Sequence, residues 1–215
     1  LSLYALALTL QGQRAVDKLR ESVAAYRELT KDYPERQSAQ HGLSRILKTF
    51  ASHLKDLSIS AEAPVLAEEA LELDRKMLAA RPQDAERKLD LSFALSLMGT
   101  FSADRHDYKK AAQYLVEVCS IREQIVKATP QDLRALDRLG FALRSLGLYE
   151  MRAGDRSSGE RSFKRGHQIA KDLDARRALT LQQVRQWAQT LSDTSKTLDE
   201  ARSPIACMYA AEAVR

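Results

Sequence analysis

The chain repeats itself at an interval of 48 residues. The prolines Pro34, Pro82 and Pro130 recur at this spacing, each between a bulky or polar residue and a Glu or Gln. Leucines follow nine and thirteen residues after each proline, at Leu43 and Leu47, Leu91 and Leu95, and Leu139 and Leu143. One further period leads to Trp187 and Leu191. Self-similarity at a period of about 20 to 50 residues is typical of stacked repeats. The chain is therefore predicted to be an array of one repeated unit.

Each unit is predicted to contain two helices and no strand, because no alternating β-branched run lies between turn residues. The first helix is expected over residues 83–99, with apolar residues at helical spacing and Gly99 as its cap. The second carries a triplet of apolar residues: Ala63, Ala67 and Ala70, then Ala111, Leu115 and Val118, then Gly159, Phe163 and Gly166. Small outer residues let helices approach closely. Where the central residue is only Ala67, the unit is expected to pack closer or to fill the space from a neighbour.

These residues resemble the tetratricopeptide repeat (TPR) family, whose unit has Leu and Gly in the first helix, a small-large-small triplet in the second and a closing proline. Leu146-Gly147 and Met98-Gly99 match the first feature, and Pro82 and Pro130 match the last. The family unit has about 34 residues, so each helix here is expected to be longer by about two turns. The resemblance implies an all-α, right-handed solenoid of antiparallel helix pairs. Long-helix arrays of this kind resemble those in large bacterial signalling and effector proteins.

One array is predicted to span the chain, with units at about 1–33, 34–81, 82–129, 130–177 and 178–215. Residues 4–8 match the pattern of residues 91–95, and Cys207, Ala211 and Val214 match the triplet loosely. Both ends are therefore expected to lie inside helices of a longer protein. In the first unit, nine residues are missing between Gly12 and Pro34 relative to later units. Either residues 1–33 form one continuous helix, or a turn is absent from the sequence, and the register preserved on both sides favours the second reading.

The composition fits such an array. Of the 215 residues, 44% are hydrophobic, which is enough for a continuous apolar stripe between neighbouring helices. No segment approaches the about 18 consecutive apolar residues of a membrane span. Cys119 and Cys207 both fall on apolar helix positions and are interpreted as buried free thiols. Two such thiols point to a reducing compartment and so to a cytoplasmic location.

The net charge of +5 is concentrated in residues 131–185, where twelve Arg or Lys stand against seven Asp or Glu. Such a region suits docking to an acidic partner or to nucleic acid. The alternative is a solvated outer helix face, which the interleaved Asp155 and Glu160 favour. Few aromatic residues accompany the arginines, which argues against a stacking platform for single strands. Nucleic acid is therefore the less favoured partner.

Sequence motifs for catalysis or metal binding are missing from the chain. Its eight glycines are isolated and form no phosphate-binding loop. The four histidines, at 41, 53, 106 and 167, show no HExxH spacing, and no CxxC occurs. The sequence therefore predicts no enzyme, no cofactor and no structural metal.

The resemblance implies that the first helix of each pair lines a concave groove. The residues 7, 11 and 14 places after each proline would then face this groove. The candidate partner-binding residues at these places are His41, Arg45, Lys48, Phe93, Phe141, Arg144, Arg185 and Gln189. Basic ends with two phenylalanines between them suit a peptide that carries an apolar anchor between acidic residues. The alternative is that Phe93 and Phe141 pack against the next helix.

The sequence thus predicts a protein-interaction scaffold that binds another chain, or a domain of the same polypeptide, in this groove. Two alternatives stay open: a regulatory array that controls a linked catalytic domain, and a nucleic-acid-binding surface in the basic region. The register also makes a prediction about stability. Leu95→Ala is expected to cost about 2 to 5 kcal/mol, whereas Lys48→Ala, on an exposed groove, is expected to leave stability nearly unchanged.

Overall fold

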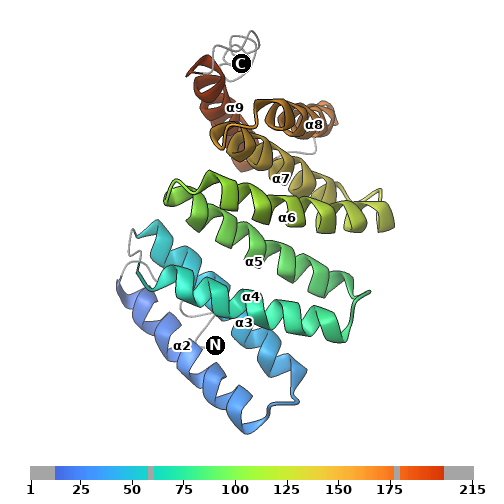
Figure 1. The fold of residues 1–215 in the computed structure, drawn as a ribbon. Coiled ribbons are helices and arrows are strands. Elements are labelled where there is room, and N and C mark those ends of the chain that lie inside the picture. Colours follow the sequence, from blue (N-terminus) through green and yellow to red (C-terminus); the bar gives the residue numbers. More distant parts are fainter. Residues whose placement is uncertain (1–12, 58–60, 177–179, 201–215) are drawn as a thin grey trace. The chain divides into compact units, whose positions relative to one another are not determined.

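The computed structural model describes residues 13–57, 61–176 and 180–200, and in these ranges the chain is all-α (Figure 1). Eight helices and no strand occur in them. The helices are α2 (Gln13–Asp32), α3 (Gln37–Asp56), α4 (Ala63–Ala80), α5 (Ala85–Asp104), α6 (Tyr108–Ala128), α7 (Leu133–Arg152), α8 (Arg156–Ala175) and α9 (Leu181–Glu200). Consecutive helices pack against each other, as α2 does with α3, α3 with α4, α6 with α7 and α7 with α8.

The chain divides into two compact units, an N-terminal unit of residues 1–98 and a C-terminal unit of residues 99–215. Each unit has its own core. Phe50 and Leu47 are fully buried in the N-terminal unit, and Phe163 and Val118 in the C-terminal one. Within the described ranges, no helix combines the length and the apolar character that a bilayer crossing requires.

The 48-residue period is confirmed by the bounds of the helices. The first helices α3, α5, α7 and α9 begin at residues 37, 85, 133 and 181, and each has 20 residues. Capping side chains follow the same period, because Asp84, Asp132 and Thr180 accept hydrogen bonds from the first turns of α5, α7 and α9. Asp107 and Asp155 do the same for α6 and α8. Such caps satisfy backbone N–H groups at the helix start, so each boundary is set locally.

Gly99 lies inside α5 and does not end it, which corrects the predicted helix of residues 83–99. α5 continues to Asp104. A Cβ atom at Gly99 would lie 2.4 Å from Leu115 Cδ2 on α6, so glycine makes room for the Leu115 side chain and does not form a turn. The left-handed backbone comes later, at His106 (φ 60°) and, one period on, at Gly154 (φ 95°).

The predicted leucine stripe and the triplets are buried. The six leucines from Leu43 to Leu143 have exposed fractions of 0 to 4%. The small outer triplet residues bring helix backbones together, most directly between α7 and α8. A Cβ at Gly147 would lie 2.6 Å from the Gly159 oxygen, and one at Gly166 would lie 2.6 Å from the Gly140 oxygen. The side chain of Leu191, and Cys207, Ala211 and Val214, lie outside what the structure describes.

The central position of the triplet is matched by the helix packed against it. Gly99 and Gly147 face the large central residues Leu115 and Phe163. In the unit of residues 34–81, where the central residue is Ala67, the equivalent of these glycines is Ala51, and both alanines are fully buried. The smaller central residue, Ala67, thus occurs together with a larger residue at the glycine position, Ala51.

α2 is the second helix of the predicted unit of residues 1–33, in which the sequence analysis identified no triplet. Ala15, Leu19 and Ser22 lie one period before the triplet that begins at Ala63, and their exposed fractions are only 1 to 2%. The triplet escaped notice because its third member is polar, but the Ser22 hydroxyl donates to the Lys18 carbonyl oxygen (2.7 Å) and is satisfied within the helix. The choice between a continuous helix and a missing turn concerns residues 1–12, which lie outside the described ranges.

Candidate functional site

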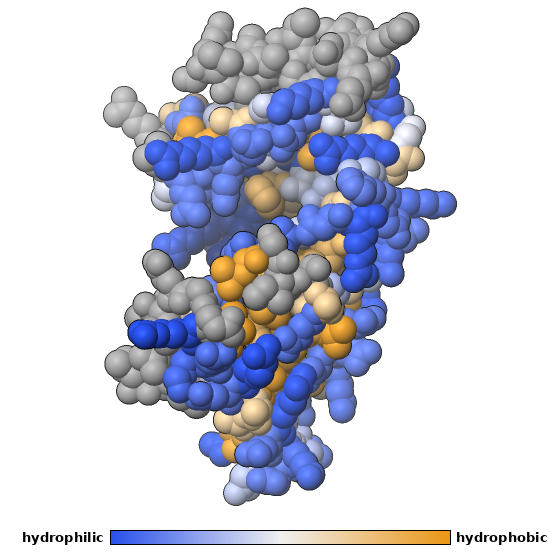
Figure 2. Space-filling model, turned by 90° about the vertical axis from the view of Figure 1, so that its left-hand side faces the viewer, coloured by the Kyte–Doolittle hydropathy of each residue, from blue (hydrophilic) through white to orange (hydrophobic). Residues whose placement is uncertain are grey.

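One of the three predicted groove positions is exposed in all four first helices. It is held by Arg45 on α3, Phe93 on α5, Phe141 on α7 and Gln189 on α9. The two phenylalanines keep 40% and 39% of their surface exposed. Side chains of this kind are usually buried, so an exposed aromatic that recurs at one repeat position is a candidate contact for a partner. Figure 2 shows apolar residues that reach a mostly hydrophilic surface in patches.

Lys48 does not lie on an open groove, contrary to the prediction. Its side chain is only 12% exposed, and its Nζ lies 2.7 Å from Asp74 Oδ2 on α4 and 3.4 Å from Asp90 Oδ1 on α5. Ser44 Oγ donates to the other oxygen of Asp74 (2.5 Å). Lys48 therefore links α3 to α4 and α5 within the N-terminal unit.

Asp74 is the most enclosed charge in this network, with a side chain that is 0% exposed. Burial raises the pKa of its carboxyl above the ordinary value of 3.8, and the ammonium group of Lys48 and the hydroxyl of Ser44 oppose that rise. A buried carboxylate is costly unless it is paired and hydrogen-bonded. The expectation that Lys48→Ala leaves stability nearly unchanged is thus replaced by an expectation of marked destabilisation.

Arg144 is also wrongly placed by the groove prediction. It is 3% exposed, and its NH1 donates to the Gly166 carbonyl oxygen on α8 (3.1 Å). Burial lowers its pKa to about 10, so it remains charged at neutral pH. Lys48 and Arg144 occupy the same repeat position, and both reach toward the second helix of their own pair. In α3 and α7, the position fourteen residues after the proline therefore faces the second helix of the pair and not an open groove.

Part of the basic excess in residues 131–185 is likewise internal or paired. Besides the buried Arg144, Arg165 NH1 lies 2.6 Å from Glu123 Oε1 and Arg156 Nε lies 3.0 Å from Glu160 Oε1. Arg185 on α9 is exposed, and its place in a groove stays a prediction. Cys119 is a buried free thiol, also as predicted, and burial raises its pKa to about 12.

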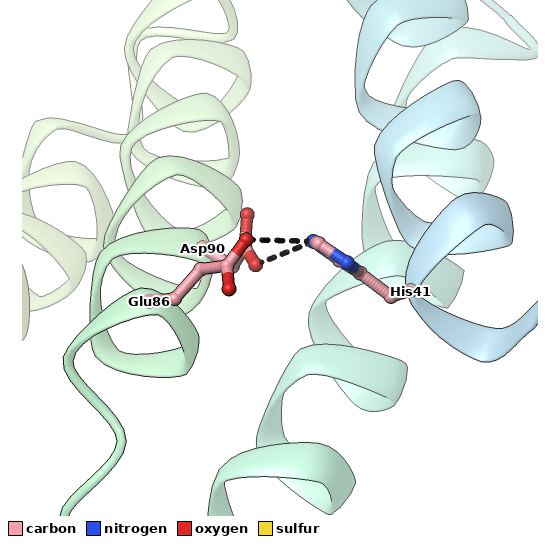
Figure 3. A group of neighbouring side chains, drawn as sticks. All are labelled: His41, Glu86 and Asp90. Carbon is pink, nitrogen blue, oxygen red and sulfur yellow. Dashed lines mark ion pairs between the residues drawn. The ribbon is translucent and has the colours of Figure 1, made fainter. Parts of the chain in front are cut away.

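His41 meets two carboxylates of α5, as Figure 3 shows. Its Nε2 lies 2.9 Å from Asp90 Oδ2 and 3.9 Å from Glu86 Oε1. The side chains of His41 and Asp90 are 16% and 15% exposed, whereas that of Glu86 is 68% exposed. The cluster therefore sits at the edge of the Lys48 network with one side open to solvent.

Ion pairs between helices repeat at a separation of 42 residues, a signal that the sequence reading missed. Arg20 with Glu62, Arg27 with Glu69, Lys48 with Asp90, and Arg165 with Glu123 all share it. The first pair joins α2 to Glu62, the N-cap of α4, and the second joins α2 to α4 itself. The third joins α3 to α5, and the fourth joins α6 to α8. Helices of the same kind in successive units therefore lie side by side within each compact unit. A search of the sequence for opposite charges 42 residues apart, six fewer than the repeat period, would have indicated which helices are neighbours.

The comparisons with known proteins do not assign a family. No protein-family model and no curated protein matches the chain. Among solved structures, it is similar to the crystal structure of BtubC (BKLC) from P. vanneervenii, with 17% sequence identity and a TM-score of 0.46. The match covers 94% of this chain and 89% of that chain. A likeness at this level leaves the function to be argued from the chain's own residues.

Proposed function

We propose that the chain is a right-handed, TPR-like solenoid that binds a protein or peptide partner through the exposed side of its first helices. The observation that carries the proposal is the exposure of Phe93 and Phe141 at one repeat position. The solenoid is supported by the ion pairs 42 residues apart, because they join first helices to first helices and second helices to second helices of successive units.

The chemistry of the partner follows from the polar residues around these helices. A cleft of about 630 Å³ lies between the N-terminal ends of α7 and α9, and Arg134, Arg138, Gln182 and Gln186 line it. Asp137 lines it too, and its Oδ2 accepts a hydrogen bond from Gln183 Nε2 (2.5 Å), so the two arginines face one carboxylate that is already bonded. Guanidinium groups recognise carboxylates and side-chain amides pair with peptide groups. An extended peptide with acidic residues beside an aromatic or aliphatic anchor fits both features.

A display library of random peptides tests the proposal, with the full chain as immobilised target. Enriched peptides are titrated by calorimetry against the wild type and against the double variant Phe93→Ser/Phe141→Ser. We expect the variant to bind at least tenfold more weakly, which corresponds to about 1.4 kcal/mol. The matched control is Val65→Ser/Val116→Ser, which removes two exposed valines from the second helices.

Equal binding by the two double variants would place the contact elsewhere, and no enrichment on the wild type would remove peptide binding. A parallel titration with single-stranded and duplex nucleic acid at low salt tests the basic region. Affinity that falls steeply with rising salt would indicate phosphate contacts and would contradict a peptide groove as the main site.

A further inference from the structure

The cluster of His41, Glu86 and Asp90 places three potential metal ligands from two helices around one point (Figure 3). One imidazole nitrogen and two carboxylate oxygens all lie within 4.8 Å of one another. Glu86 and Asp90 are one turn apart on α5, so both carboxylates point to the same side, where α3 presents His41. Sequence motifs gave no hint of the cluster because its members are separated by 45 and 49 residues.

Asp90 Oδ2 is the unusual atom in this cluster. It is buried and accepts no hydrogen bond from the residues that the structure describes. His41 Nε2 lies only 2.9 Å away, but the two atoms are not arranged as donor and acceptor. A buried carboxylate oxygen without a hydrogen bond is costly, and a cation between the oxygen and the imidazole nitrogen would satisfy both.

We propose that His41, Glu86 and Asp90 bind a divalent transition-metal ion such as Zn²⁺. Bonds of about 2.1 Å to nitrogen and oxygen put neighbouring ligand atoms about 3.0 Å apart in an octahedron and about 3.4 Å apart in a tetrahedron. The observed separations from Nε2, 2.9 Å to Asp90 and 3.9 Å to Glu86, bracket these values. In an octahedron the Asp90 separation already fits, and the exposed Glu86 side chain has to move closer to Nε2. The imidazole ligand selects zinc or its neighbours over Ca²⁺ and Mg²⁺, which prefer oxygen.

The local charges identify what competes with the ion. Three carboxylates, of Asp74, Glu86 and Asp90, stand against the cations of Lys48 and Arg87. Lys48 is closer to Asp74 than to Asp90, so it keeps its main partner when a metal takes Asp90. Arg87 NH1 lies 3.6 Å from Asp90 Oδ2, the oxygen that the metal needs. Arg87 is therefore the group that the ion displaces.

Calorimetry on the metal-free full chain tests the site with Zn²⁺ as the probe. We expect one equivalent of Zn²⁺ to bind and to raise the melting temperature. His41→Gln is expected to weaken binding at least tenfold and Glu86→Gln severalfold, whereas Arg87→Gln strengthens it severalfold by removing the competing cation. The Arg87 variant separates ligation from general damage, because a variant that merely disturbs the fold does not bind more tightly.

His106→Asn is the matched control, since it removes an exposed histidine outside the cluster and keeps a residue that tolerates the left-handed backbone. We expect it to bind Zn²⁺ like the wild type. Visible absorption of bound Co²⁺ that is lost in both His41→Gln and Glu86→Gln would support the ligand set. Absence of Zn²⁺ binding, or binding that neither substitution changes, would overturn the site, and Ca²⁺ binding as tight as that of Zn²⁺ would contradict the metal class.

Discussion

The helix pairs α3–α4 and α7–α8 occupy the same place in the repeat but cross by different means. In α7–α8 the four crossing positions are all glycine, namely Gly140, Gly147, Gly159 and Gly166, and the backbones touch. In α3–α4 the equivalent positions are Ser44, Ala51, Ala63 and Ala70, which are buried but carry side chains. The repeat therefore determines at which positions the two helices cross, and the residues at these positions determine how closely the helices approach.

Buried charge differs between the two pairs in the same way. In α3–α4 a buried carboxylate, Asp74, is neutralised by Lys48 and receives the Ser44 hydroxyl. In α7–α8 a buried cation, Arg144, donates to the backbone oxygen of Gly166. One pair thus depends on matched charges and the other on backbone proximity.

The leucine stripe is the feature that both pairs share, and its loss gives the largest expected effect. Leu47 and Leu143 occupy the same repeat position, and their exposed fractions are 0% and 4%. We expect Leu47→Ala and Leu143→Ala each to lower the free energy of unfolding by about 4 kcal/mol, as measured by urea denaturation. A difference of more than about 2 kcal/mol would show that the cores are not equivalent, because cavity costs at fixed chemistry vary over about that range.

Lys48→Ala tests whether the α3–α4 pair depends on charge matching. Leaving Asp74 buried without its nearest cation is expected to cost about 3 kcal/mol. The double variant Lys48→Met/Asp74→Leu removes both charges and is expected to recover most of that loss in urea denaturation. A double variant as unstable as the single one would mean that Lys48 acts by packing alone.

Gly147→Ala tests the backbone contact of the α7–α8 pair. The added methyl group would meet backbone atoms at 2.6 Å. We expect a net loss of about 2 kcal/mol, although alanine favours a helix by about 1 kcal/mol over glycine. The reciprocal change Ala51→Gly in α3 is expected to cost about 1 kcal/mol through propensity. Lys164→Ala on the exposed side of α8 is the control, and a stabilising Gly147→Ala would show that the helices separate freely.

The smallest effect expected is a pH dependence specific to the α3–α4 pair. Because burial raises the pKa of Asp74, the folded state binds the carboxyl proton more tightly than the unfolded state does. This preference adds to the free energy of unfolding, fully so below the ordinary pKa of 3.8, and the added stability is lost as pH rises through the folded pKa. The stability of the wild type relative to Asp74→Asn should therefore fall as pH rises from 3.8. Denaturation of both proteins across this window measures it, and parallel curves would contradict it. Arg144, with a pKa of about 10, does not titrate there.

The all-α content and the packing of consecutive helices were predictable because the prolines, leucines and triplets are local features repeated at a fixed interval. Gly99 shows what local features do not predict. A glycine at the end of a helical pattern suggests a helix cap, whereas Gly99 leaves space for the Leu115 side chain. Its role depends on a helix that lies elsewhere in the chain, and a single-helix pattern does not contain that information.

The candidate sites were predictable only in part, for a related reason. The exposure of Arg45, Phe93, Phe141 and Gln189 follows from helical geometry within one helix. Lys48 and Arg144 were misplaced because long basic side chains look solvated in sequence, and their burial depends on acceptors 26 and 22 residues away. His41 gained its carboxylate neighbours from a later helix, which no spacing motif describes.

The order of residues in the charged network also bears on how the chain folds during synthesis. A nascent chain emerges from its N-terminus at about 5 to 20 residues per second. Ser44 and Lys48 are therefore already present when Asp74 emerges, and this carboxylate meets its partners as α4 forms. Arg144 emerges 22 residues before the Gly166 oxygen that receives it, a wait of about one to four seconds at that rate. Lys48 waits for Asp74 over 26 residues in the same way. In both pairs a solvated cation therefore precedes the second helix, and the pairs differ in what receives it, a carboxylate in one and a backbone oxygen in the other.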